Sequence, residues 1–186
     1  MTKILFTLSL LLTLVSCGGS TTQKEEKIEP VKRIAGWEIL TAEDYSIQYP
    51  KDWELNQNGQ MGTSFILFSA LENDEDNFRE NVNLLVQSLQ GQSVDLDAFT
   101  EISEGQVKSM LTNCTLYLSK RMKKGTQDYH KLIYTADQGG VSLKFVQYYW
   151  IENDNAYVLT LTCQESSFSR FKETGEKILN SFSLGK

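Results

Sequence analysis

Few residues of the sequence have the type and spacing that catalysis or metal binding requires. His130 is the only histidine, and it stands beside Tyr129 and Lys131 in a predicted strand, so we expect a surface or core residue rather than a catalytic base. A single histidine excludes a site with several histidine ligands, and the cysteines lack zinc spacing. No glycine-rich loop has the phosphate-binding pattern, and no serine lies in a nucleophile elbow. The sequence therefore predicts no catalytic residue, no metal and no cofactor.

Two clusters of charge could bind ions or charged partners. The first consists of carboxylates, at Glu72, Asp74, Glu75 and Asp76. They could supply oxygen ligands for calcium, but they lack the spaced ligands and the fixed glycine of a calcium loop, so we expect a solvated loop. The second consists of basic residues in a predicted hairpin, at Lys120, Arg121, Lys123 and Lys124. These could meet an acidic partner or phosphate groups of the cell envelope; a solvated turn is the simpler alternative.

The segment around Cys17 predicts a covalent modification. Lys3 precedes an apolar stretch from Ile4 to Val15, which at about a dozen residues is shorter than the roughly 20 that span a bilayer and suits a signal peptide. Leu14-Val15-Ser16-Cys17 resembles the lipobox, where bacterial enzymes attach diacylglycerol to the cysteine thiol and cleave before it. A plain secretory signal with a chance cysteine, or a buried core helix, is the alternative. Residues 1–16 are thus the predicted lipoprotein signal peptide, and Cys17 is the predicted lipidation site.

Residues 17–36 are the predicted flexible tether. Their composition cannot bury enough apolar surface to offset chain entropy, and about 18 flexible residues have an r.m.s. reach of roughly 23 Å. Gly18 takes the place of the aspartate that favours retention in the inner membrane, so we expect the outer membrane of a Gram-negative bacterium. Gln23-Lys24-Glu25-Glu26 resembles a surface-export signal of some bacterial lipoproteins. An ordinary charged linker is the alternative. The sequence therefore does not decide whether the protein lies on the periplasmic face or on the cell surface.

The charge of the chain argues against nucleic acid as a partner. The net charge is −6, and cleavage before Cys17 removes Lys3 and no acid, which leaves −7. Phosphate attraction dominates nucleic-acid binding, and an acidic protein gains nothing from it. Anionic lipid would also repel the chain weakly, so we expect the lipid on Cys17 to hold the protein at the membrane.

Cys114 and Cys163 remain once Cys17 is lipidated, in a compartment that permits disulfides. A bond between them would close a loop of about 50 residues and stabilise the fold by roughly 4 kcal/mol in the chain-entropy model. The predicted strands place both at the same end of a meander but three strands apart, which is too far in a flat sheet. The disulfide is therefore a candidate, and two buried free thiols are the alternative.

Residues 37–186 are the predicted folded domain, long enough to bury a core without metal or disulfide. Alternation of apolar and polar residues predicts strands over 45–49, 64–71 and 81–89. Four further strands are predicted over about 114–122, 128–136, 141–152 and 156–164. The breaks between these four contain Gly125, Gly139-Gly140 and Asn153-Asp154, and their spacing suits antiparallel hairpins. Apolar residues on both faces of 141–152 predict a central strand that is covered on both sides.

Two segments have the helical period. Asp95 can cap a helix whose apolar stripe is Leu96, Phe99, Ile102, Val107, Met110 and Leu111. Ser167 can cap a second helix, with apolar residues at Phe168, Phe171, Ile178 and Phe182. A mainly antiparallel β-sheet with helices on both faces belongs to the α+β class and forms an α/β/α sandwich.

Two groups of motifs frame residues 37–184. The opening group is Tyr45-x-Ile47-x-Tyr49-Pro50-x-x-Trp53, the Phe65 strand and Phe78-Arg79-Glu80-Asn81-Val82-Asn83. The closing group is Tyr157-Val158-Leu159-Thr160-Leu161-Thr162, Phe168 and Ile178-Leu179-Asn180-Ser181-Phe182. Together they resemble PsbP-like domains, the family that includes PsbP, Mog and DcrB-like lipoproteins. This resemblance implies the same sandwich, and it implies binding to other proteins rather than catalysis. The motifs belong to the scaffold, so no functional residue of the family carries over.

Three hypotheses about function follow. The first is a lipid-anchored, non-catalytic protein of the cell envelope that binds another envelope protein. The second is capture of a small ligand or an apolar peptide in a groove between sheet and helix, with candidate lining residues Trp53, Tyr148, Tyr149 and Trp150. The third is a hydrolase with paired carboxylates from distant positions, which requires a cleft with a raised carboxylate pKa.

Overall fold

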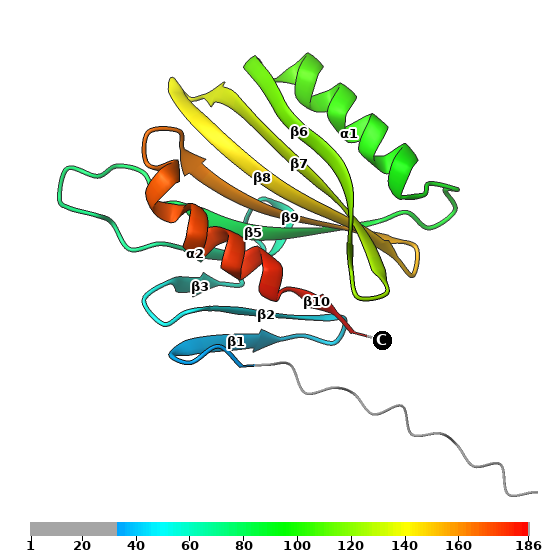
Figure 1. Ribbon diagram of the computed structural model, residues 1–186, viewed down its shortest axis with the longest axis horizontal. Helices are drawn as coiled ribbons and strands as arrows, with labels where there is room; N and C mark the ends of the chain where they lie inside the picture. The colour runs from blue at the N-terminus through cyan, green and yellow to red at the C-terminus, as the bar shows by residue number, and fades with distance from the viewer. Residues whose placement is uncertain (1–32, 186) are drawn as a thin grey trace, which may run out of the picture. The chain divides into compact units, whose positions relative to one another are not determined.

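A seven-stranded antiparallel sheet forms the centre of the described part of the chain, residues 33–185 of a computed structural model (Figure 1). Its strand order is β3, β4, β5, β9, β8, β7, β6. The bounds in that order are Glu54–Asn56, Thr63–Phe68, Asn81–Ser88, Asn155–Gln164, Val141–Glu152, Gln127–Gln138 and Thr112–Lys124. Strands β6 to β9 form a meander, and β5 pairs with the far side of β9. The predicted signal peptide, Cys17 and most of the predicted tether lie outside the described residues.

Tight turns connect the long strands. The β7–β8 turn contains Gly139 and Gly140, and the β8–β9 turn contains Asn153 and Asp154. All four have positive φ. Two successive residues of positive φ match the twist of hairpin strands, and glycine, asparagine and aspartate adopt this conformation at the lowest cost. The predicted hairpins are therefore confirmed.

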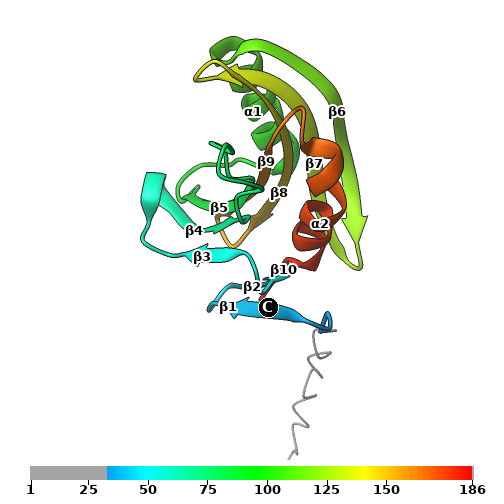
Figure 2. The same cartoon turned by 90° about the vertical axis from the view of Figure 1, so that its left-hand side faces the viewer.

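Strand β8 is buried on both faces, as its sequence predicts. Val146, Tyr148 and Trp150 enter one apolar cluster, and the alternate residues Leu143, Phe145 and Tyr149 enter another. The two clusters lie on opposite sides because side chains alternate along a strand. One cluster contains residues of α2 and the other contains residues of α1, and Figure 2 shows the sheet between these helices. The predicted α+β class, with helices on both faces, is confirmed.

Helix α1 (Leu96–Met110) begins at Asp95, whose carboxylate accepts a backbone hydrogen bond of 2.9 Å from Ala98. The predicted apolar stripe is wrong at Ile102, whose side chain is 53% exposed. The reason is that Ile102 lies about 120° around the helix from the buried Leu96. Met110, in the last turn, is 77% exposed. The buried face of α1 is thus narrower than the sequence pattern indicates.

Helix α2 (Phe168–Ser181) covers the other face, over β9 and β5. Ser167 stands at the predicted cap position, but its side chain makes no capping hydrogen bond. Its hydroxyl donates instead to the carboxylate of Glu80, which is buried. A buried carboxylate needs donors around it, so this bond fixes the start of α2 to the segment before β5. Neither of these two described helices is long and apolar enough to cross a membrane.

A second sheet, of three strands, packs beside α2. Its order is β1 (Trp37–Thr41), β2 (Tyr45–Pro50) and β10 (Ser183–Leu184). The inward residues of β2 share the apolar cluster of α2, so this sheet extends the cover of that face. Strands β1, β3 and β10, and a 3-10 turn at Gln60–Gly62, were not predicted. The sequence of β1 does not alternate between apolar and polar residues, and the other segments contain too few residues to show a period.

Gly175 allows α2 to approach β9 closely. A Cβ placed on Gly175 would lie 2.5 Å and 2.7 Å from the two methyl carbons of Leu161, which is fully buried. Gly105 in α1 is different, because a Cβ there would meet no atom within 4 Å. Gly175 is therefore required for the close packing of α2, whereas Gly105 is not required for the packing of α1.

We expect Gly175→Ala to lower the free energy of unfolding by about 1–3 kcal/mol, the usual effect of overpacking a core, although alanine is the better helix former. Gly105→Ala should raise the free energy of unfolding by up to about 1 kcal/mol, because it removes the entropy penalty of a helical glycine without a clash. Urea unfolding followed by tryptophan fluorescence measures both differences. Changes of the same sign in the two variants would contradict the close approach of α2 to Leu161.

Candidate functional site

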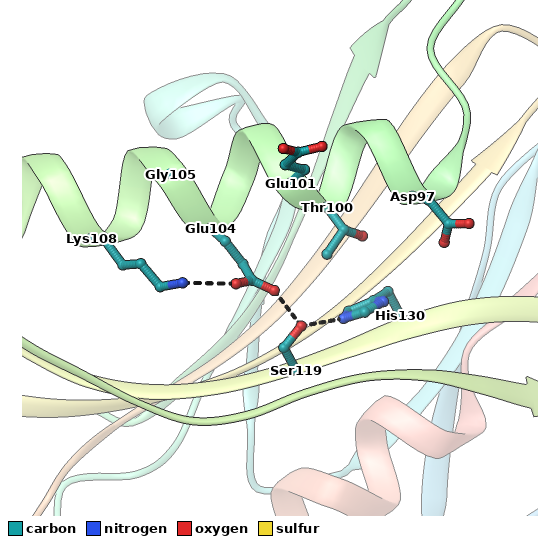
Figure 3. A pocket seen from close by; sticks show the side chains of 8 residues that line it. All are labelled: Asp97, Thr100, Glu101, Glu104, Gly105, Lys108, Ser119 and His130. Carbon is teal, nitrogen blue, oxygen red and sulfur yellow. Dashed lines mark hydrogen bonds and ion pairs between the residues drawn. The ribbon is translucent and has the colours of Figure 1, made fainter.

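A polar groove of about 470 Å³ lies between α1 and β6, and we call it the α1–β6 groove (Figure 3). Helix α1 ends at Met110 and β6 begins at Thr112, so the helix has to lie beside this edge of the sheet. The lining residues are Asp97, Thr100, Glu101, Glu104, Gly105, Lys108, Ser119 and His130. Three carboxylates, one ammonium group, two hydroxyls and the imidazole thus face one hollow.

A chain of hydrogen bonds crosses the groove from the helix to the sheet (Figure 3). Lys108 donates to Oε2 of Glu104 at 3.0 Å. Oε1 of the same carboxylate accepts from the hydroxyl of Ser119. The Ser119 oxygen lies 2.7 Å from Nε2 of His130. Residues from α1, β6 and β7 are thereby joined.

The direction of this chain fixes the tautomer of His130. The hydrogen bond from Ser119, helped by Lys108, lowers the pKa of Glu104, so this carboxylate is ionised and can only accept. Ser119 uses its one proton on Glu104, so its oxygen accepts from Nε2–H of His130. Burial lowers the pKa of His130, which keeps the ring neutral at pH 7. Its Nδ1 is therefore an acceptor, and it is buried without a hydrogen-bond partner among the described residues.

This arrangement differs from that of a hydrolase. In serine hydrolases the histidine accepts the serine proton, and an acid orients the histidine. Here the histidine donates to Ser119, and Glu104 accepts from the serine instead. A general acid would also need a raised pKa, whereas the pKa of Glu104 is lowered. The Ser119–His130 pair therefore lacks the geometry of a serine hydrolase, and Glu104 lacks the raised pKa of a general acid.

Sequence reasoning identified His130 but not its partners. The residue is 8% exposed, as a core histidine is, yet its Nδ1 has no hydrogen-bond partner among the described residues. Ser119 lies opposite β7 through the β6–β7 register, and Glu104 reaches it from a helix 15 positions earlier. The only local signal was the spacing of Glu104 and Lys108, which suits an i,i+4 helix pair.

The four cations of the predicted basic hairpin do not form one patch. Successive side chains of a strand point to opposite faces, so Arg121 and Lys123 are separated from Lys120 and Lys124. Arg121 pairs with Asp97 at 2.7 Å and with Asp128 at 3.0 Å. Lys120 and Lys123 stay exposed, and partner binding through them stays a prediction.

Lys124 is the second cation of the hairpin with an internal role. Its Nζ donates to the backbone carbonyls of Asn180 and Phe182, at 2.6 Å and 3.0 Å. These carbonyls belong to the C-terminal end of α2, where a cation is favoured. Although much of the side chain is exposed, desolvation of the ammonium group lowers the pKa of Lys124. The hairpin therefore holds α2 in place.

The position of β6 at the edge of the sheet gives the hairpin charges a structural role. An edge strand presents unpaired backbone groups that can pair with other chains, and charged residues and bulges hinder such pairing. The register of β6 against β7 shifts twice, between Thr112 and Thr115 and between Leu116 and Leu118. Bulges in the first half of β6 and cations in its second half therefore hinder the pairing of this edge with another chain.

The acidic loop forms hydrogen bonds within itself. The carboxylate of Asp76 accepts from the backbone N–H groups of Glu72 and Phe78, at 2.9 Å and 3.1 Å. These bonds lower the pKa of Asp76. Glu72 pairs with Arg170 of α2 at 2.6 Å. Across residues 33–185 no group of three or more histidine, cysteine, aspartate or glutamate side chains is placed to hold a metal ion.

Cys114 and Cys163 are free thiols in the structure. Cys114 lies on β6 and Cys163 on β9, with β7 and β8 between them. Three strand spacings amount to about 14 Å, and a disulfide requires Cα atoms within about 7 Å. The candidate disulfide is therefore not formed. Burial raises the pKa of both thiols.

The family profile described as PsbP-like protein matches residues 16–184, which is most of the chain. The chain belongs to the PsbP-like family. The resemblance seen in the sequence motifs is thereby confirmed, and Cys17 falls within the matched residues. No curated protein sequence matches this chain.

Solved structures of low sequence identity share the PsbP-like fold. For cyanobacterial PsbP (CyanoP) from Synechocystis, the TM-score is 0.60 at 14% identity, over 92% of this chain and 99% of that one. For LpqN of Mycobacterium tuberculosis, the TM-score is 0.59 at 11% identity, over 76% and 83% of the two chains. For PA94 of Pseudomonas aeruginosa, a protein of unknown function, the TM-score is 0.56 at 11% identity, over 77% and 93%. Such identities establish the fold and nothing further.

We expect folding to lose stability as the pH falls below about 6.5, because the pKa of His130 lies below that value in the folded chain and the unfolded chain therefore binds the proton more readily. Burial is the main cause; Glu104 and Asp97 oppose it, and Arg121 adds to it. His130→Gln keeps a donor for Ser119 but does not titrate, so it should lack this dependence. Urea unfolding from about pH 8 to about pH 5.5 compares the two chains. If the free energies of unfolding of the two chains fall in parallel with pH, the imidazole of His130 is not neutral and buried. Carboxylates such as Glu104 titrate at lower pH, so they do not account for a difference in this range.

Proposed function

We propose that this PsbP-like protein is held to the cell envelope by lipid on Cys17 and acts there, without catalysis, by binding another envelope protein. The lipobox-like motif at Leu14–Cys17 supports the anchor. Membership of the PsbP-like family supports a scaffold suited to binding. LpqN, which shares the fold, is described as involved in cell envelope biogenesis. The glycine after Cys17 favours the outer membrane.

The observation that carries the non-catalytic part of this proposal is the hydrogen-bond direction in the α1–β6 groove. Ser119 gives its proton to an ionised Glu104, and His130 donates to Ser119. A serine in this arrangement has no basic nitrogen facing it, because Nε2 of His130 carries the proton, so activation by the triad mechanism does not follow. What the groove offers instead is a set of fixed polar groups that can recognise a partner.

The second hypothesis, an apolar peptide between sheet and helix, finds little support in its candidate lining, although Trp150 borders a hollow of about 330 Å³ beside the start of α1. All four aromatic residues proposed for it are buried in the core: Trp53, Tyr148, Tyr149 and Trp150. Tyr129 stacks on Trp150 with ring centroids 5.5 Å apart, and Tyr149 meets Phe99 edge to face at 5.6 Å. The α1–β6 groove is lined mainly by polar and charged side chains, so it suits a polar ligand or partner.

The predicted tether limits where the partner can lie. Eighteen or so flexible residues span about 60 Å at full extension and roughly 23 Å on average. A lipid-bound Cys17 would therefore keep the domain within tens of ångströms of the membrane surface. The proposed partner is accordingly a membrane protein or a protein close to the membrane.

We expect Cys17→Ala to abolish incorporation of an alkyne-labelled fatty acid and to release the protein from the membrane fraction. The thiol of Cys17 is the only attachment point that the lipobox-like motif provides. Cys114→Ala is the matched control, because it removes another thiol and should leave labelling unchanged. Labelling of the Cys17→Ala chain at the native level would overturn the anchor.

We expect cross-linking in cells, followed by affinity purification and mass spectrometry, to recover one envelope protein reproducibly with the full chain. Residues 1–36 fused to an unrelated domain provide the control, because this fusion should share the membrane neighbours but not the partner. If a well-expressed chain recovers only the proteins that the fusion recovers, the proposed function is wrong.

A further inference from the structure

Two of the residues that line the α1–β6 groove have a hydrogen-bond acceptor without a partner among the described residues. The first is the carboxylate of Glu101, which is exposed at the groove and forms no ion pair or hydrogen bond within residues 33–185. The second is Nδ1 of His130, on a side chain that is 8% exposed. In Figure 3 this nitrogen lies on the side of the ring away from Ser119, toward the first turns of α1. A bound molecule that offers hydrogen-bond donors would satisfy both acceptors.

The charges of the groove point to a cation as the missing donor. Three carboxylates and one ammonium group line it. Lys108 pairs with Glu104, and Arg121 pairs with Asp97, so the charge of Glu101 remains uncompensated between these two pairs. An anion would be repelled by the same carboxylates, and no group of three metal-ligating side chains is assembled in the described residues.

We propose that the α1–β6 groove binds a cationic side chain, arginine or lysine, of the partner protein. This inference rests on the proposed function and names the chemistry that the partner presents. The carboxylates of Glu101 and Glu104 supply charge-assisted acceptors, and such bonds are about twice as strong as neutral ones. Nδ1 of His130 is covered in the free chain, so the imidazole turns to bring this acceptor to the ligand. That rotation exchanges the Ser119 contact for the contact with the cation.

The single histidine of the chain provides the test. The full chain, with ¹⁵N-labelled histidine and in detergent micelles, is titrated with an acetylated and amidated tri-arginine peptide at constant ionic strength. We expect a saturating change in both imidazole nitrogen shifts. Tri-glutamate should cause none. Glu101→Gln should weaken tri-arginine binding about tenfold, whereas Glu173→Gln, the same change at an exposed and unpaired position of α2, should leave it unaltered. No shift in the native chain, or equal weakening by the two variants, would overturn the groove site.

Cross-linking in cells separates this inference from the proposed function. Glu101→Lys places a cation at the groove, and Glu173→Lys is its matched control. Loss of the partner with Glu101→Lys alone supports the groove. If both variants capture the partner as the native chain does, the groove site is wrong and the proposed function stands. If the native chain captures no partner, the proposed function is wrong, and the peptide titration decides the groove site by itself.

Discussion

Burial of the central strands on both faces is the constraint on which the rest of this structure depends. Strand β8 places large apolar side chains on each side of the sheet, and an antiparallel sheet with two apolar faces is stable in water only when both are covered. Helix α2 and the small sheet cover one face, and α1 covers the other. Gly175 lets α2 lie directly on Leu161, and Lys124 holds the far end of α2 from the β6–β7 hairpin. Helix α2 is thus held by contacts in its middle and at its C-terminal end.

The α1 side is covered differently, and this difference creates the groove. Only a narrow face of α1 is apolar, with Leu96 and Phe99 buried near its first turns. Beyond them the helix runs beside an edge strand, and its groove-facing residues are mostly polar or charged. The polar contact between α1 and β6 is made by the Asp97–Arg121 ion pair and by the Glu104–Ser119–His130 chain. Exposed ion pairs contribute about 0–1 kcal/mol each, so the apolar turns hold the helix and the polar part is free to serve another purpose.

Local sequence patterns made most of the fold predictable, whereas the α1–β6 groove depends on the register between β6 and β7. The hairpins of the meander follow from turn residues such as Gly139-Gly140 and from alternation, both of which act over a few residues. Helix α1 follows from its cap at Asp95. The predicted apolar stripe failed at Ile102 because the pattern counted apolar residues without testing whether they share one side of the helix. The basic hairpin was predicted as one cluster, but alternation sends Arg121 and Lys124 to opposite faces. The link from Glu104 to His130 needed the β6–β7 register and the position of α1, which no local pattern contains.

His130 is the residue that a requirement for stability alone does not explain. The next three positions on this face of β7 are apolar or aromatic: Leu132, Tyr134 and Ala136. An apolar residue at position 130 would continue that row, whereas a buried imidazole with an unpaired Nδ1 costs about 1–3 kcal/mol. The hydrogen bond between His130 and Ser119 offsets this cost only in part, because Ser119 lies on an edge strand and could form an equivalent hydrogen bond with water. A group kept at such a cost, in a groove that the helix leaves open and that an uncompensated carboxylate also lines, is better explained by recognition than by packing. The proposed partner site therefore lies at the α1–β6 edge, on the face of the sheet opposite α2.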